Sequence, residues 1–271
     1  MKKIKISKSI VCYNSHKYNI WWELKEYIDS DKLKTLVEKV EKSINSACIF
    51  VLWGDWTILK SIRQTYEKNL PILGINFWTK GFLLNSIEDI DKNNSFLSVQ
   101  YPLIECTIKT KKECFSRIAF NEIDIRADTW KVLDLDIFLE KENEKNLKVN
   151  LKWDGFIFST PAGSTGYNYS LWWPIIPHWL ETFVLTPKAP LSPRNFRSIV
   201  LEQDREVIVK NVWRLSDIKI ICDWSDFFET NDEEIKIFLK KSKDYITFLF
   251  PENSKSILKD KIFLEQWFEF L

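Results

Sequence analysis

The first third of the chain alternates between helical and strand-like patterns of apolar residues. Apolar side chains recur at helical spacing from Leu33 to Ile44, and an uninterrupted apolar run follows at residues 47–52. A second helical pattern begins at Thr57, and residues 71–76 indicate another buried strand. Short apolar runs between helices are typical of strands that are covered on both faces. The pattern therefore predicts a parallel sheet flanked by helices.

Beyond about Phe96 the pattern changes to alternation of apolar and polar positions. The alternation is clearest from Leu133 to Leu139 and from Ile235 to Leu239, which indicates half-buried antiparallel strands. Near the end, residues 261–271 carry apolar side chains at helical spacing, so we expect an amphipathic helix that packs on the first domain. The predicted fold is α/β plus all-β. It has a Rossmann-like parallel α/β domain (residues 1–97 plus 251–271) and an antiparallel β-sandwich domain (98–250).

Composition narrows the class of protein. The apolar content of 45% supplies a full hydrophobic core, and a formal net charge of +1 without a basic aromatic cluster argues against a nucleic-acid partner. No apolar stretch is long enough to span a membrane, so we expect no membrane association. The five cysteines are scattered without a CxxC pair, which favours reduced thiols and a cytoplasmic protein. No set of metal ligands is visible.

Tryptophan and glycine occur in an unusual ratio. The chain has 13 Trp and 6 Gly, whereas glycine is ordinarily much the commoner residue. Lysine, isoleucine and asparagine are also abundant, a bias that usually accompanies an AT-rich coding sequence. The excess of tryptophan therefore needs its own explanation.

An acidic loop separates the first predicted strand from the helix that follows it. Its sequence is Trp53-Gly54-Asp55-Trp56-Thr57. Either Asp55 or Thr57 could cap the helix, because both residue types accept hydrogen bonds from the free amides of a first turn. Alternatively, the carboxylate takes part in chemistry at the carboxyl end of the strand.

Five segments in order resemble the signatures of the NAD kinase family. Residues 53–57 are similar to GGDGT, 71–83 to a family strand and turn with LGIN and GFL, and 153–167 to GDG.I.STP.GSTAY. The pair Asn121-Glu122 matches the family's Asn-Glu, and residues 172–175 match its GGPI. The resemblance extends from about residue 47 to residue 225.

Tryptophan stands at seven positions where the family has glycine. These positions are Trp53, Trp56, Trp78, Trp153, Trp172, Trp173 and Trp224. Glycine in such loops adopts positive φ and lets backbone amides approach phosphate, and an indole prevents both. Our hypothesis is that the source organism reads the UGA codon as glycine and that the sequence was translated with UGA as tryptophan. Genuine tryptophans would instead be encoded by UGG.

The resemblance implies transfer of a phosphoryl group from ATP or another donor to the 2′-hydroxyl of NAD, giving NADP. A ribose hydroxyl is a poor nucleophile, so a base must receive its proton, and the family's equivalent of Asp55 lies beside that hydroxyl. The implied cofactor is Mg²⁺ or a similar divalent cation carried by the nucleotide phosphates. A homo-oligomer, dimer or tetramer, is implied as well.

The residues that the resemblance places at the NAD site come from both domains. They are Gly54, Asp55, Trp56, Phe82, Asn121, Glu122, Asp154, Thr165, Gly166, Tyr167 and Ser170. Simpler interpretations stay open for several of them: a strand-end turn for Asn121-Glu122, an ordinary turn for Asp154 and a core position for Phe82. The chain departs from the family pattern at Ala162, which lacks a hydroxyl, and at Gly166, where the family has Ala.

Two other classes of protein remain as alternatives. One is a different kinase with a GGDGT loop, such as the diacylglycerol, sphingosine or phosphofructokinase groups. The other is a noncatalytic NAD(P)-binding or scaffolding protein whose loop is blocked by real tryptophans. Asn121-Glu122 and residues 163–167 argue against the first, and the mass of the native residues at positions 53 and 56 would test the second.

Overall fold

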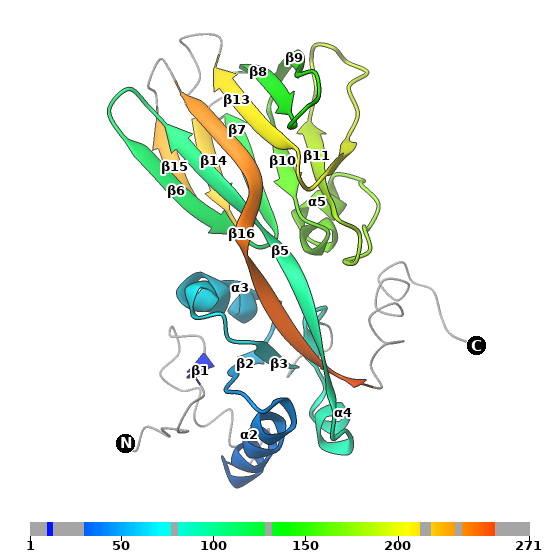
Figure 1. Cartoon of the computed structure of the whole chain (residues 1–271). Coiled ribbons are helices and arrows are strands. Elements are labelled where there is room, and N and C mark those ends of the chain that lie inside the picture. Colours follow the sequence, from blue (N-terminus) through cyan, green and yellow to red (C-terminus); the bar gives the residue numbers. More distant parts are fainter. Residues whose placement is uncertain are drawn as a thin grey trace, which may run out of the picture. The chain divides into compact units, whose positions relative to one another are not determined.

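The chain forms two compact units. The computed structural model describes residues 10–12, 30–76, 81–127, 132–211, 218–230 and 235–252 (Figure 1). One unit is Met1–Tyr101 with Tyr245–Leu271, and the other is Pro102–Asp244. Both divisions lie inside long strands, β5 (Phe96–Lys109) and β16 (Lys236–Pro251). The boundaries predicted at residues 97 and 251 fall in the same two strands. None of the described helices is long and apolar enough to cross a membrane.

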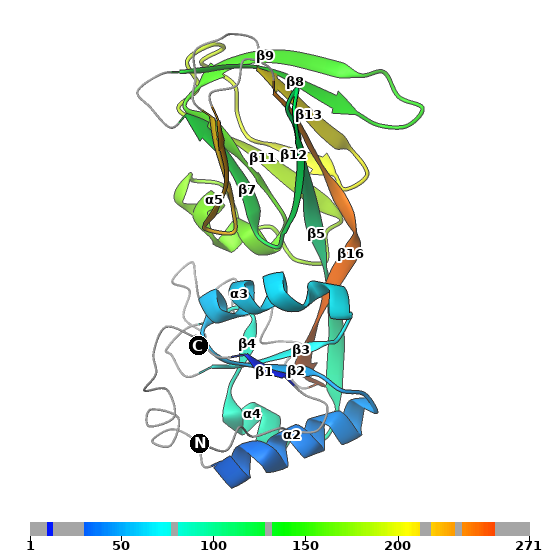
Figure 2. The same ribbon diagram turned by 90° about the vertical axis from the view of Figure 1, so that its left-hand side faces the viewer.

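The first unit is a parallel sheet with helices on both faces. Strands β1 (Ile10–Cys12), β2 (Ile49–Trp53) and β3 (Ile72–Asn76) are neighbours in that order, and both β4 (Leu84–Asn85) and β16 pair with β3. All of these pairings are parallel. The helices are α2 (Ser30–Ile44), α3 (Asp55–Thr65), η1 (Tyr66–Lys68) and α4 (Ile87–Lys92). Figure 2 shows α3 over one face of the sheet and α2 with α4 over the other. The predicted parallel α/β fold is confirmed.

Packing in this unit follows from the apolar runs. Phe50 and Leu52 of β2 belong to one buried cluster with Leu36 and Val40 of α2, as expected for a helix that places every third or fourth side chain against a sheet. Helix α3 begins at Asp55, two residues before the position that its apolar pattern predicted. The helix expected at residues 261–271 lies outside the described residues.

The second unit is an antiparallel β-sandwich, as predicted. One sheet has the order β12 (Ile199–Glu202), β11 (Thr182–Lys188), β10 (Gly155–Ser159), β7 (Glu122–Ala127), β14 (Ile218–Cys222), β15 (Ser225–Thr230). The facing strands are β5, β6 (Cys114–Ala119), β16, β13 (Glu206–Asn211), β8 (Leu133–Glu140) and β9 (Leu147–Trp153). Within both sheets of this unit, the strand pairs with a described register are antiparallel.

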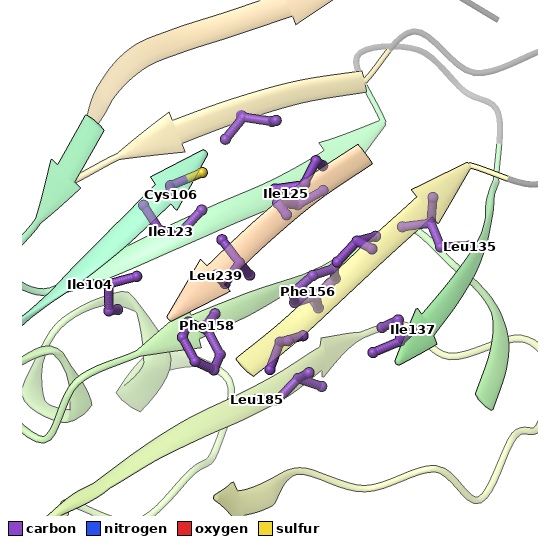
Figure 3. Close-up of a cluster of buried hydrophobic side chains, with 14 of the residues drawn as sticks. Ile104, Cys106, Ile123, Ile125, Leu135, Ile137, Phe156, Phe158, Leu185 and Leu239 are labelled. Atoms are coloured by element: carbon purple, nitrogen blue, oxygen red, sulfur yellow. The ribbon is translucent and has the colours of Figure 1, made fainter. Parts of the chain in front are cut away.

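Alternating side chains of the two sheets fill one core. Leu135 and Ile137 of β8 and Leu239 of β16 meet Ile125 of β7 and Phe156 of β10 (Figure 3). These positions include the alternating residues that predicted half-buried strands, so that prediction is confirmed.

The face of the six-stranded sheet that points away from this core carries two acidic side chains among apolar ones such as Ile157. Cross-strand partners share a face, and the pairs Ser159 with Glu122 and Ile157 with Asp124 therefore place both carboxylates on the side away from the core. The segment that follows β10 contains two short helices, η2 (Ala162–Thr165) and α5 (Tyr167–Ser170).

Candidate functional site

The acidic loop of the first unit connects β2 directly to α3. Gly54 is the N-cap of α3 in extended conformation, with φ −147° and ψ 171°, and its carbonyl accepts from the N–H of Thr57 at 2.9 Å. No side chain caps this helix. The interpretation of Asp55 or Thr57 as the helix cap is therefore wrong. Because Gly54 starts the helix through its backbone alone, the carboxylate of Asp55 is left for another contact.

That contact is with the turn before β4. The N–H of Phe82 donates to Oδ2 of Asp55 at 2.9 Å, and the N–H of Leu83 donates to Oδ1 at 3.2 Å. Asp55 is partly buried. Burial raises the pKa of the Tyr101 hydroxyl, and the negative charge of Asp55 raises that pKa further. Two consecutive amides thus fix the direction of an ionisable side chain at the carboxyl end of β2, where ligands bind in sheets of this type.

Trp56 and Phe82 are two further residues of this unit that the sequence predicted at the site. The indole of Trp56 is 56% exposed in the first turn of α3. Phe82 is only partly buried, and it binds Asp55 through its backbone N–H. The core interpretation of Phe82 therefore does not describe its whole role, since the residue also orients Asp55.

In the second unit, Asn121 and Glu122 lie where β7 begins. Asn121 occupies the link between β6 and β7, and Glu122 is the first residue of β7. The N–H of Thr160 donates to the carbonyl of Asn121 at 2.9 Å, and the Thr160 hydroxyl donates to the carbonyl of Phe120 at 2.7 Å. The pair is thus at a strand end, as the simpler interpretation held, and its backbone is also bound to the segment after β10.

Glu122 is a buried carboxyl group with an unusual environment. Its side chain is 3% exposed, and its Oε2 has no hydrogen-bond partner among the described residues. Burial raises its pKa well above the ordinary value of 4.5, with the charges of Asp223 and Asp124 adding to the effect and that of Lys188 opposing it. A buried polar atom without a partner is rare in folded proteins and is found at sites that await a ligand.

Two glycines allow the segment after β10 to pack closely on Asn121 and Glu122. A Cβ at Gly163 would lie 2.3 Å from the carbonyl oxygen of Asn121, so no other residue fits there without displacing backbone. A Cβ at Gly166 would lie 3.3 Å from Oε2 of Glu122 and 3.9 Å from Nδ2 of Asn121. Gly166 is therefore next to both predicted side chains.

Tyr167 and Thr165 flank Gly166. The ammonium group of Lys188 lies 4.6 Å from the centre of the Tyr167 ring and forms an ion pair with Asp124 on the same sheet face. The ring of Trp224 lies 5.7 Å from that of Tyr167. Thr165 donates its hydroxyl to the carbonyl of Ala162 at 3.1 Å, which is a contact within its own turn.

Asp154 and Ser170 line a cavity on this unit. Its volume is 720 Å³, within the range of small-molecule sites. The lining residues are Arg126, Ala127, Asp154, Tyr167, Ser170, Leu171, Trp172, Pro187, Lys188 and Ala189. Asp154 is exposed in the link between β9 and β10, so the turn interpretation holds for its backbone while its side chain borders the cavity.

The structure thus forms two groups of predicted residues. Gly54, Asp55, Trp56 and Phe82 gather at the carboxyl end of β2, and Asn121, Glu122, Asp154, Thr165, Gly166, Tyr167 and Ser170 gather around the segment after β10. Sequence reasoning did not assign a role to Asp223 or Lys188. The sequence marked Trp224, the residue after Asp223, as a position where the family has glycine, but it marked neither Asp223 nor Lys188. Among the described residues, no cluster of His, Cys, Asp or Glu could hold a metal ion.

Comparison with known proteins identifies the family. Residues 125–248 match the family model of the ATP-NAD kinase C-terminal domain. An NAD kinase of Xanthomonas oryzae is 30% identical over 230 residues, which cover 81% of this chain and 84% of the relative. The crystal structure of yeast NADH kinase complexed with NADH has a TM-score of 0.69 at 20% identity, over 83% of this chain and 69% of that one.

An NAD kinase from Archaeoglobus fulgidus, whose crystal structure is a complex with ATP, has a TM-score of 0.61 at 22% identity. That match covers 94% of this chain and 97% of the archaeal one. At these identities the two solved structures show a common fold. The 30% sequence identity with the Xanthomonas protein, over most of both chains, shows the family as well. The chain belongs to the NAD kinase family.

Proposed function

We propose that this chain is an NAD kinase that transfers the γ-phosphoryl group of ATP to the 2′-hydroxyl of the adenosine ribose of NAD, giving NADP and ADP. The proposal rests on Asp55, whose carboxylate is held by the N–H groups of Phe82 and Leu83 instead of capping α3. A side chain that is oriented by backbone amides and is only partly buried suits a base that must meet a substrate hydroxyl.

In the proposed reaction the 2′-oxygen of the ribose forms a bond to the γ-phosphorus as the bond from that phosphorus to the ADP oxygen breaks. The hydroxyl proton passes to the carboxylate of Asp55. Gly54 and the first turn of α3 supply backbone amides at a helix N-terminus, which favours negative charge on a phosphate. In this reaction the protein positions the two substrates and accepts one proton.

The second unit holds NAD in this proposal. Glu122 and Asn121 hydrogen-bond the ribose hydroxyls and the adenine, and the unpartnered Oε2 of Glu122 supports that assignment. Gly166 lets the ligand approach both side chains closely, because a glycine adds no side chain beside them. Asp154, Tyr167 and Ser170 border the 720 Å³ cavity, which we assign to the remainder of the dinucleotide.

ATP is the donor that we propose, with a divalent cation such as Mg²⁺ bound mainly by the nucleotide phosphates. The archaeal relative forms a complex with ATP, which supports this choice of donor. Because the described residues offer no ligand cluster, a cation carried by the nucleotide fits them better than a protein-bound one. Neutralisation of phosphate charge is the chemistry that the cation supplies.

We also propose a homo-oligomer in the cytoplasm. The exposed carboxylate of Asp154 at the edge of the cavity is available to a second subunit, as the family resemblance implies. Cys106 and Cys114 are free thiols in the part of the chain that the structure describes, which is the usual state in a reducing compartment.

We propose further that glycine is the natural residue where tryptophan occupies a motif position. Trp172 and Trp224 have φ of 61° and 63°, the left-handed region that favours glycine. Trp172 is also 96% exposed, so packing does not explain its indole. Trp153 is fully buried with no described partner for its indole N–H, which costs free energy of about 1–3 kcal/mol. The codons at these positions test the proposal, with UGA expected and UGG contradicting it.

The function is tested with two full-length proteins: the chain as printed, and a glycine-restored chain with glycine at positions 53, 56, 78, 153, 172, 173 and 224. Each is incubated with NAD, ATP and Mg²⁺, and NADP is measured with an NADP-specific dehydrogenase. We expect NADP from the glycine-restored chain. A glycine-restored chain that phosphorylates a lipid or a sugar phosphate and leaves NAD unchanged would contradict the proposal.

A further inference from the structure

The hairpin between β14 and β15 ends in an unusually constrained turn. Cys222 and Ser225 form the last strand pair, so Asp223 and Trp224 are the two central residues of the turn. Both have positive φ, 45° and 63°, which is the pattern of a type I′ turn. Asp-Gly is a preferred sequence for this turn, since glycine adopts the second position without strain. The turn conformation determines where the side chain of Asp223 points.

The carboxylate of Asp223 accepts hydrogen bonds from three consecutive backbone amides. The N–H of Phe120 donates to Oδ2 at 2.8 Å, and the N–H groups of Asn121 and Glu122 donate to Oδ1 at 2.7 Å and 3.2 Å. The N–H of Asp223 itself donates to the carbonyl of Glu122 at 3.2 Å. Asp223 is 1% exposed, so these bonds are made away from water, where charge-assisted hydrogen bonds are strong.

The same stretch of backbone is held from its other side by Thr160. The carbonyl of Phe120 accepts from the Thr160 hydroxyl, and the carbonyl of Asn121 accepts from the Thr160 N–H. Residues 120–122 therefore have their N–H groups bound by one element and two of their carbonyls bound by another. Little rotation of this backbone is possible while both sets of bonds are intact.

Rotation of this backbone would move the side chains that face Gly166. Oε2 of Glu122 and Nδ2 of Asn121 lie 3.3 Å and 3.9 Å from the position of a Cβ on Gly166. A change of a few tens of degrees in φ or ψ at residue 121 displaces such side-chain atoms by an ångström or more, and a displacement of that size weakens binding strongly.

We propose that Asp223 is a positioning residue for NAD, whose carboxylate sets the direction of the Asn121 and Glu122 side chains by binding the N–H groups of residues 120–122. The inference rests on the proposed function in that Asn121 and Glu122 are taken to contact NAD. Asp223 is too deeply buried to touch the substrate in this arrangement, and it acts through the two residues that do. Its effect is therefore on the affinity for NAD rather than on the transfer step.

The test is Asp223→Asn in the glycine-restored chain. Asparagine tolerates positive φ, so the turn is kept, but its amide cannot accept from all three N–H groups. We expect the Kd for NAD, measured by titration calorimetry, to rise roughly tenfold or more. The KM for ATP and the kcat at saturating NAD should stay within about twofold, because the loop at Asp55 is unchanged.

Asp134→Asn is the matched control. Asp134 is another carboxylate of the second unit, and it accepts a hydrogen bond from Nδ2 of Asn150 at 2.8 Å. It lies in β8 and not in the turn that holds residues 120–122. We expect its NAD affinity to equal that of the glycine-restored chain. A merely structural role of Asp223 would lower the melting temperature and raise the KM values of both substrates together, which would overturn the inference.

A second variant keeps the inference testable if Asp223→Asn fails to fold. Thr160→Val leaves Asp223 in place and removes the hydroxyl that binds the carbonyl of Phe120, so it loosens the same backbone from its other side. We expect weaker NAD binding in this variant also, and an unchanged affinity in a folded Thr160→Val protein would overturn the inference. Failure of the glycine-restored chain itself to bind NAD would instead refute the proposed function.

Discussion

Asp55 in the first unit and Asp223 in the second each accept hydrogen bonds from consecutive backbone N–H groups. Asp55 binds two amides, those of Phe82 and Leu83, and is only partly buried. Asp223 binds three and is 1% exposed. A carboxylate that is held and still accessible can receive a proton from a substrate, whereas one that is held and fully enclosed can only organise its neighbours. In our proposals the same contact serves chemistry in one unit and positioning in the other.

The largest expected effect is that of Asp55→Asn in the glycine-restored chain. The amide keeps the size of the carboxylate but cannot accept the hydroxyl proton, so we expect kcat to fall by about 100-fold or more. The fold and the affinity for NAD should be kept, as measured by circular dichroism and calorimetry, because the amide oxygen still accepts from one of the two N–H groups and the residues proposed to bind NAD in the second unit are unchanged. Retained turnover would remove Asp55 from the role of base.

Gly163→Ala should have the next largest effect, on stability and NAD binding together. The added Cβ would lie 2.3 Å from the Asn121 carbonyl oxygen, and relief of such a contact displaces the backbone at a cost of about 2–3 kcal/mol. Chemical denaturation measures the change.

Gly166→Ala is the control for that substitution. Its nearest contacts are at 3.3 Å, so the neighbouring atoms need to move by only a few tenths of an ångström. We expect a loss of less than about 1 kcal/mol. Equal losses in the two variants would contradict the close approach at Gly163.

The pH dependence of stability tests the environment of Glu122. Its pKa in the folded protein is raised above 4.5, so the protonated form is favoured by folding. The stability that this group contributes is therefore fully present below its unfolded pKa and is lost as pH rises through the folded value. Glu122→Gln cannot ionise, so the variant should gain stability relative to the parent as pH rises above about 4.5. A difference between the two proteins that does not change with pH would contradict the raised pKa.

The smallest expected effect is that of Trp224→Gly in the printed chain. Removing a non-glycine residue from positive φ should raise the free energy of unfolding by about 1 kcal/mol, as measured by urea denaturation.

Trp179→Gly is the matched control. Trp179 is 52% exposed, similar to the 55% of Trp224, but it is not among the described residues with positive φ. We expect no gain in stability from this variant. A gain at Trp179 equal to that at Trp224 would show that exposure, and not backbone strain, limits stability.

The fold could be predicted from the sequence because its signals are local. The apolar run at residues 47–52 and the mainly apolar segment at residues 71–76 predicted buried parallel strands, and the alternation from Leu133 to Leu139 predicted a half-buried one. The division between the units could not be placed in the same way. It lies within β5 and β16, where the strand pattern continues without a break.

The site was predicted only as far as its motifs extend. Asp55 was predicted as a site residue because it occupies a loop with a family signature, yet nothing in the sequence indicates its bonds to the N–H groups of Phe82 and Leu83. Asp223 contacts residues about 100 positions away through their backbone, and a main-chain partner places no constraint on side-chain type. The ammonium group of Lys188 lies over the Tyr167 ring only because β11 and β7 pair with β10 on either side. The sequence does not reveal these strand pairings.

The most direct test compares Asp55→Asn with Asp223→Asn, measuring the Kd for NAD and the kcat of NADP formation in the same glycine-restored chain. The account predicts that the first variant loses kcat and keeps its Kd, while the second raises Kd and keeps kcat at saturating NAD. If both variants changed the same constant to the same extent, the two carboxylates would not have the separate roles assigned to them.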